Sequence, residues 1–245
     1  MIKIKKFLPL IIFGLGVIVL ALVYFFVIVP AMNKPVVNPA DESALMDISL
    51  NGRPYVSMTP TDDGHYLDMV VNKITIPAAT MDYEMLYNLP DGRAQGTPGT
   101  ITLNGQTSIE RKFLLGTESS GKFRYDVGVK DGTLTLRFRN AKAQLIAKYT
   151  TQFALLSNTK TLSSVDETFK ATLTRVPVGF QVVMETFGIP VDAPAEVKYG
   201  PFGIFASNST PLVGSVDQTS YKISRYNGTA WVTDFDAGFF IGTAQ

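Results

Sequence analysis

The stretch GKFRYDVGVKDGTLTLRFRN, residues 121–140, decides the fold class, because apolar and polar residues alternate along both of its halves. Such alternation is typical of β-strands, and the Asp131-Gly132 dipeptide is typical of a type I′ hairpin turn. Folding at this turn places Tyr125 opposite Phe138 and brings the other apolar side chains to the same face. We therefore predict a β-hairpin over residues 121–140.

A second hairpin is predicted near the C-terminus, in the sequence TSYKISRYNGTAWVTD, residues 219–234. Its turn is the Asn227-Gly228 dipeptide, which favours the positive φ angles of a tight hairpin turn. Folding there places Ser224 opposite Trp231. The stretch therefore predicts two further antiparallel strands.

Short runs rich in Val, Ile, Thr, Tyr and Phe recur from about Leu45 onward at intervals of about 8–12 residues. Even residues 141–156, which come closest to a helical period, favour a strand because they are rich in β-branched and aromatic residues. The spacing and composition of these runs predict an all-β ectodomain, an antiparallel β-sandwich of immunoglobulin-like size. We expect two modules, residues 45–157 and 164–245, with one larger sandwich over 45–245 as the alternative.

Residues 7–29 carry no charge and follow Lys3, Lys5 and Lys6. A helix of that length spans the bilayer core of ~30 Å, so the stretch predicts a single N-terminal transmembrane helix. The positive-inside rule places residues 1–6 in the cytoplasm and the rest outside, which makes the protein a single-pass signal-anchor protein of the cytoplasmic membrane. The proline-rich residues 30–44 are expected to form a spacer.

A cleaved signal peptide is the alternative for this segment, because Val29 and Ala31 fit a small-residue cleavage site. The uncharged stretch is longer than the ~7–15 apolar residues of a typical signal-peptide core, which favours a retained anchor. The expected partner of residues 7–29 is therefore the lipid bilayer.

Composition excludes several functional classes. Three of the 22 basic residues precede the uncharged stretch and all 21 acidic residues follow it, so the exported part has a net charge of −2, which argues against nucleic-acid binding. The chain has no cysteine, which excludes thiol catalysis, lipidation and disulfides and favours a bacterial cell envelope. With a single histidine, His65, most acid–base chemistry is disfavoured.

The sequence contains no G-x-S-x-G motif and no complete P-loop, and we expect no cofactor. We therefore predict a non-catalytic envelope protein that binds or scaffolds an extracytoplasmic polysaccharide or protein. The alternative is an enzyme that acts on envelope polysaccharide with paired carboxylates, the glycosidase chemistry that needs neither His nor Cys. Its candidate carboxylates come from unrelated predicted strands: Glu110, Glu118, Asp126 and Glu185.

Two groups of side chains are candidate ligand-binding residues. On the second hairpin, Trp231 and Tyr226 share a face and would form an exposed sugar-stacking platform, unless Trp231 is a core residue. On the first hairpin, Arg124 is predicted to lie opposite Arg139, as an anion site or as two solvated arginines. The full set is Trp231, Tyr226 and Lys222 on one hairpin, and Arg124, Arg139 and Arg137 on the other.

Asp62, Asp63 and Asp68 are the residues that could bind a hard cation. The spacing of an EF-hand loop and its closing glutamate are absent, and Asp-Asp-Gly is common in ordinary turns. We therefore expect no metal site.

Overall fold

A computed structural model describes residues 45–245, which form seventeen β-strands and one short 3-10 helix, η3 (Leu50–Gly52). In chain order the strands are β1 (Tyr55–Pro60), β2 (Tyr66–Asn72), β3 (Thr80–Asn88), β4 (Ala94–Thr102), β5 (Ile109–Leu114), β6 (Gly116–Ser119), β7 (Lys122–Tyr125), β8 (Asp131–Arg139), β9 (Leu145–Ser157), β10 (Thr161–Ser163), β11 (Lys170–Leu173), β12 (Phe180–Glu185), β13 (Val197–Ala206), β14 (Gly214–Val216), β15 (Lys222–Tyr226), β16 (Trp231–Val232) and β17 (Gly238–Thr243). The all-β prediction is confirmed for these residues. The predicted helix over residues 7–29 and the spacer over 30–44 lie outside them.

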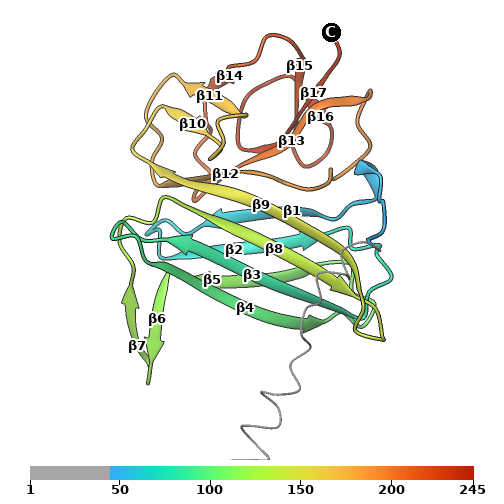
Figure 1. The fold of residues 1–245 in the computed structure, drawn as a ribbon. Helices are drawn as coiled ribbons and strands as arrows, with labels where there is room; N and C mark the ends of the chain where they lie inside the picture. The colour runs from blue at the N-terminus through green and yellow to red at the C-terminus, as the bar shows by residue number, and fades with distance from the viewer. Residues whose placement is uncertain (1–44) are drawn as a thin grey trace, which may run out of the picture. The chain divides into compact units, whose positions relative to one another are not determined.

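The strands form antiparallel sheets (Figure 1). The largest has nine strands in the order β16-β15-β17-β13-β12-β9-β8-β3-β4, and two three-stranded sheets have the orders β1-β2-β5 and β10-β11-β14. A two-stranded hairpin, β6-β7, completes the set. Within residues 45–245 there is no helix of the length and apolar character that a membrane crossing requires.

The first hydrophobic core lies between β1, β2 and β5 on one side and β3, β8 and β9 on the other. Strand β3 shows how the sequence builds it, because Met81, Tyr83 and Met85 are buried whereas Asp82 and Glu84 alternate with them on the outer face. The largest fully buried members of this core include Met58, Met69, Phe113, Phe138 and Phe153. This arrangement of two packed sheets is that of a β-sandwich.

The second hydrophobic core lies on the opposite face of β12. Val182 and Met184 pack in the first core, whereas Val183 packs in the second with Phe169 and Phe240. A strand buried on both faces is expected to be apolar throughout, and the sequence of β12, FQVVME, shows this over its middle. Since both cores share β12 and one sheet, the division into modules 45–157 and 164–245 stays a prediction, as does its single-sandwich alternative.

The hairpin predicted at Asp131-Gly132 is wrong. Strand β7 pairs with β6, and their tight turn is at Ser120-Gly121, where φ is 52° and 74°. Asp131 and Gly132 lie inside β8, which pairs with β3 on one edge and with β9 on the other. Because β8 gains two long ladders in this position, tertiary pairing overrides the local turn preference.

The second predicted hairpin exists with a shifted register. Strands β15 and β16 pair Tyr226 with Trp231, so the loop has four residues instead of the predicted two. Asn227 closes this loop, because its side-chain oxygen accepts hydrogen bonds from the backbone N–H groups of Thr229 and Ala230. A shift by two residues keeps every side chain on its predicted face.

The arginines of β8 are paired with acidic residues of β3. Arg139 is 8% exposed, and its Nε lies 2.7 Å from Oδ2 of Asp82. Arg137 pairs with Glu84 at 3.2 Å. Arg124, by contrast, is an exposed residue of the β6-β7 hairpin. The predicted juxtaposition of Arg124 and Arg139 is therefore wrong, because it depended on the pairing of β7 with β8.

We expect Arg139→Gln to lower the free energy of unfolding by about 2–4 kcal/mol, because it leaves the carboxylate of Asp82 without its partner at a mostly buried position. Arg124→Gln is the matched control and should cost less than about 0.5 kcal/mol, since that side chain is exposed. Urea unfolding followed by circular dichroism measures both. Equally small losses of unfolding free energy in Arg139→Gln and Arg124→Gln would show that Arg139 is solvated.

Candidate functional site

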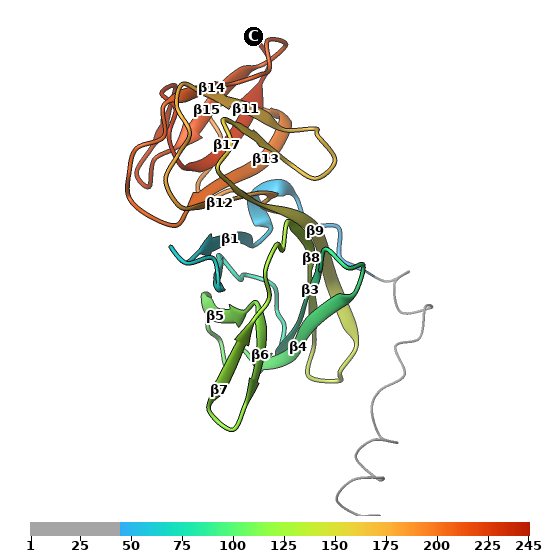
Figure 2. The same cartoon turned by 90° about the vertical axis from the view of Figure 1, so that its left-hand side faces the viewer.

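The β6-β7 hairpin projects beyond the neighbouring strands (Figures 1 and 2). It carries exposed aromatic side chains. Phe123 is 48% exposed and Tyr125 is 37% exposed. They lie two positions apart on β7, so their side chains point to the same side of the hairpin. Val127, just beyond the strand, is 85% exposed. Apolar groups of this size left in water mark a candidate binding surface.

His65 extends the aromatic surface. Its ring stacks on the ring of Tyr125, with centroids 3.7 Å apart and an angle of 4° between the planes. The rings of Phe123 and Tyr125 are also nearly parallel, with centroids 6.2 Å apart and an angle of 9°. We call these three nearly parallel rings the aromatic face. Two of its rings come from β7 and the third from the turn between β1 and β2, so only the folded chain assembles it.

The turn between β1 and β2 fixes the position of His65. Asp63 accepts hydrogen bonds from the hydroxyl of Thr61 and the backbone N–H of His65, and its other oxygen lies 3.0 Å from Nδ1 of His65. The hydrogen bond from Thr61, followed by that from the His65 backbone, holds the pKa of Asp63 below its usual value. Gly64 has a φ of 70°, and a Cβ there would lie 2.5 Å from the ring of Phe180. The turn therefore requires glycine at this position.

A cleft of about 580 Å³ opens beside His65, and we call it the hairpin cleft. The turn of residues 63–65, the segment 126–130 after β7, the end of β9 and the start of β10 form its walls. Its polar lining includes Asp63, Asp126, Lys130, Ser157, Thr159 and Thr161. Val129, Leu155 and Phe180 supply apolar surface. A concave site with apolar walls and a few polar groups is the usual form of a small-ligand site.

Asp126 is held in the cleft wall by two hydrogen bonds. Its Oδ2 accepts from the hydroxyl of Tyr87 at 2.8 Å and from the amide of Gln95 at 2.7 Å. Burial of the Tyr87 ring, followed by its hydrogen bond to the Asp126 carboxylate, raises the pKa of Tyr87. These two hydrogen bonds fix the position of the Asp126 carboxylate in the wall of the cleft.

The predicted pair Trp231 and Tyr226 is formed, with ring centroids 5.6 Å apart. Both side chains are partly buried, and Nε1 of Trp231 donates to the backbone oxygen of Asp192 at 2.9 Å. Lys222 is exposed at the other end of β15. Trp231 is thus neither a core residue nor a fully exposed platform, and ligand binding by these three residues stays a prediction.

The other predicted site residues are spread over several elements. Arg137 and Arg139 are bound in the ion pairs described above, and Arg124 lies on β7. Asp68 pairs with Lys112 at 3.6 Å, whereas Asp63 is bound to Thr61 and His65. Across residues 45–245, no three His, Cys, Asp or Glu side chains gather as a metal site would require.

The carboxylates of the predicted enzyme alternative lie on different elements. Glu110 is on β5, Glu118 on β6 and Glu185 on β12, whereas Asp126 follows β7. Burial of the Glu185 carboxyl, reinforced by the negative charge of Asp166, raises its pKa. The enzyme alternative stays a prediction.

Sequence reasoning missed the aromatic face and the hairpin cleft. The alternation of Phe123, Tyr125 and Val127 looks the same for a strand facing a core as for one facing solvent. The one available signal was Ser120-Gly121, a turn dipeptide that competes with Asp131-Gly132 for the same strand. Comparison of the chain with protein-family models, with curated proteins and with solved structures finds no match.

We expect alkaline pH to destabilise the protein partly through Tyr87. Because the pKa of Tyr87 is raised in the folded state, the stabilisation it gives is present below pH ~10, the ordinary pKa of tyrosine, and is lost as pH rises through its folded pKa. Tyr87→Phe should therefore show a shallower fall in unfolding free energy between pH 10 and 12 than the unmodified chain. Urea unfolding at a series of pH values measures both slopes, and parallel slopes would contradict this assignment.

Proposed function

We propose that the chain is a non-catalytic protein of the cell envelope, anchored in the cytoplasmic membrane through residues 7–29, whose β-sandwich binds a polysaccharide outside that membrane. The observation that carries the ligand assignment is the aromatic face, three nearly parallel rings beside an open cleft. The anchor is inferred from the uncharged stretch behind Lys3, Lys5 and Lys6. The cysteine-free composition favours a bacterial envelope.

A sugar ring has an apolar face of C–H groups and an edge of hydroxyl groups. Phe123, at 48% exposure, supplies a ring on which the apolar face can stack, whereas one face of the neighbouring Tyr125 ring is already covered by His65. The hydroxyls of Ser157, Thr159 and Thr161 lie in the adjacent cleft, where they can donate to and accept from the sugar hydroxyls. This combination of flat rings and hydroxyl groups favours a polysaccharide over a protein partner.

The two carboxylates of the hairpin cleft are poor catalysts as they stand. A glycosidase needs one carboxylic acid that is protonated near neutral pH, which requires a raised pKa. Asp63 has a lowered pKa, and Asp126 already accepts two hydrogen bonds. Binding without hydrolysis is therefore the function that this cleft supports best. A carboxylate enzyme built around Glu185 is the alternative, and loss of glycan hydrolysis in Glu185→Gln would establish it.

The proposed membrane anchoring and orientation predict the result of a protease experiment. Protease added to intact spheroplasts should digest residues 45–245 and leave a small fragment that contains residues 1–29 in the membrane fraction. A soluble cytoplasmic protein expressed in the same cells is the control and should stay intact, because the intact membrane shields it from the protease. Full protection of the chain would exclude the proposed orientation.

We expect Tyr125→Ala and Phe123→Ala to weaken retention on insoluble polysaccharide by about tenfold each, because each removes one stacking surface. Sedimentation of the full chain in detergent with peptidoglycan sacculi, chitin or cellulose measures retention. Trp231→Phe is the control on the other aromatic pair and should bind as the unmodified chain does.

The opposite pattern, with binding lost in Trp231→Phe and kept in Tyr125→Ala, would move the site to β15 and β16. Equal retention of all variants would contradict aromatic stacking altogether. Retention of none of the three polysaccharides by the unmodified chain would contradict the proposed ligand class and favour a protein partner. Folding of each variant is checked by circular dichroism.

A further inference from the structure

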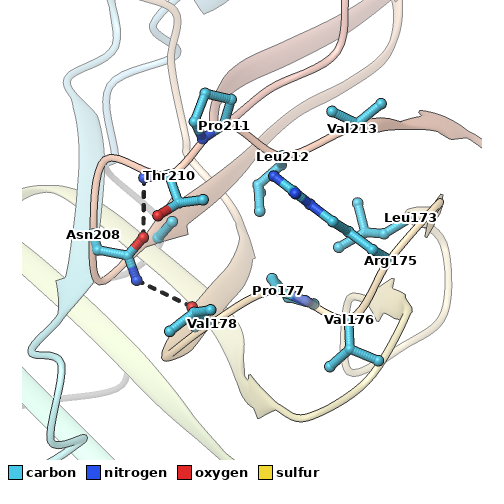
Figure 3. A pocket seen from close by; sticks show the side chains of 11 residues that line it. Leu173, Arg175, Val176, Pro177, Val178, Asn208, Thr210, Pro211, Leu212 and Val213 are labelled. Carbon is cyan, nitrogen blue, oxygen red and sulfur yellow. Dashed lines mark hydrogen bonds between the residues drawn. The ribbon is translucent and has the colours of Figure 1, made fainter.

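A small apolar pocket lies between the segment that joins β11 to β12 and the segment that joins β13 to β14 (Figure 3). Its volume is about 140 Å³, and it shares no lining residue with the hairpin cleft. Most of its walls are aliphatic, formed by Leu173, Val176, Pro177, Val178, Leu212 and Val213. We call it the valine pocket. Cavities of roughly 150 Å³ hold a molecule the size of benzene, so this one has room for a single aliphatic side chain.

The mouth of the valine pocket exposes apolar side chains to water. Val178 is 71% exposed, Val213 is 52% exposed and Val176 is 43% exposed. These three residues come from two separate segments that the pairing of Leu173 with Gly214 holds together. A cluster of exposed valines around a concavity marks a place where an apolar group can be buried.

Arg175 is the charged residue of this pocket. Its side chain extends from the β11–β12 segment toward Leu212 on the opposite wall (Figure 3). Within residues 45–245, no hydrogen bond or ion pair engages its guanidinium, in contrast to the paired Arg137, Arg139 and Arg225. An unpaired guanidinium beside an apolar cavity favours a ligand that joins a carboxylate to an aliphatic group.

We propose that the valine pocket binds the free C-terminus of a peptide that ends in an aliphatic residue. The carboxylate pairs with Arg175, and the last side chain fills the cavity. A fatty acid satisfies the first contact only, since its chain exceeds a cavity of about 140 Å³. The peptide C-terminus is thus the carboxylate that uses both features.

The test uses the full chain in detergent and the peptide acetyl-Gly-Gly-Val with a free carboxylate. Ligand-observed NMR titration measures its Kd, and the same peptide with a C-terminal amide and octanoate serve as comparison probes. We expect the free acid to bind roughly ten- to a hundredfold more tightly than the amide, because a hydrogen bond to a charged group is lost in the amide. Equal binding of acid and amide, or no binding of the acid at millimolar concentration, overturns the proposal. Tighter binding of octanoate overturns the peptide assignment in favour of a lipid carboxylate.

One variant and its matched control locate the binding. Arg175→Gln should weaken the free acid to the level of the amide, whereas Arg124→Gln, at an exposed arginine on β7, should leave the Kd of the acid unchanged. If Arg175→Gln binds the acid as the unmodified chain does, the pocket is not the site. Arg175 does not line the hairpin cleft, so polysaccharide retention should persist in Arg175→Gln, and loss of peptide binding is distinguishable from failure of the proposed function.

Discussion

Burial of β12 on both faces is the constraint on which the rest of the structure depends. Because side chains alternate along a strand, Val182 and Met184 enter one core while Val183 enters the other. Strands β9 and β13 pair with the two edges of β12, which places β12 inside the sheet of nine strands. No disulfide supplements these cores, since the chain has no cysteine.

Both candidate sites lie where the chain leaves the sheets. The hairpin cleft is built from the β1–β2 turn, the segment after β7 and the connection between β9 and β10. The valine pocket is built from the segments before β12 and before β14. Connecting segments can carry exposed aromatic and aliphatic groups because the sheets behind them supply the rigidity. The ligands proposed for the two sites differ because one site offers flat rings and hydroxyls, whereas the other offers an unpaired guanidinium beside aliphatic walls.

Electrostatics separates the arginines of this chain into two functional kinds. Arg139 and Arg225 are mostly buried and are paired with Asp82 and Asp234, so their charges serve the fold. Arg175 is exposed and has no acidic partner within residues 45–245, so its charge is open to a ligand. The amino-acid composition does not distinguish the buried, paired arginines from the exposed, unpaired one. Only the position of β3 beside β8, and of Asp234 beside β15, shows which arginines are already neutralised.

The all-β class and the hairpin at Asn227 follow from the sequence, because they depend on local properties: a period of two, β-branched residues and turn dipeptides. It also placed Trp231 beside Tyr226, since a register shift by two residues keeps both faces. It did not determine the partner of β8, and with it the places of Arg124, Arg137 and Arg139, because each candidate turn was locally acceptable. That choice was decided by tertiary structure, in which β8 forms ladders with β3 and β9 instead of one short hairpin with β7. The aromatic face and the valine pocket likewise join residues far apart in the chain, and no local pattern records which distant segments will meet.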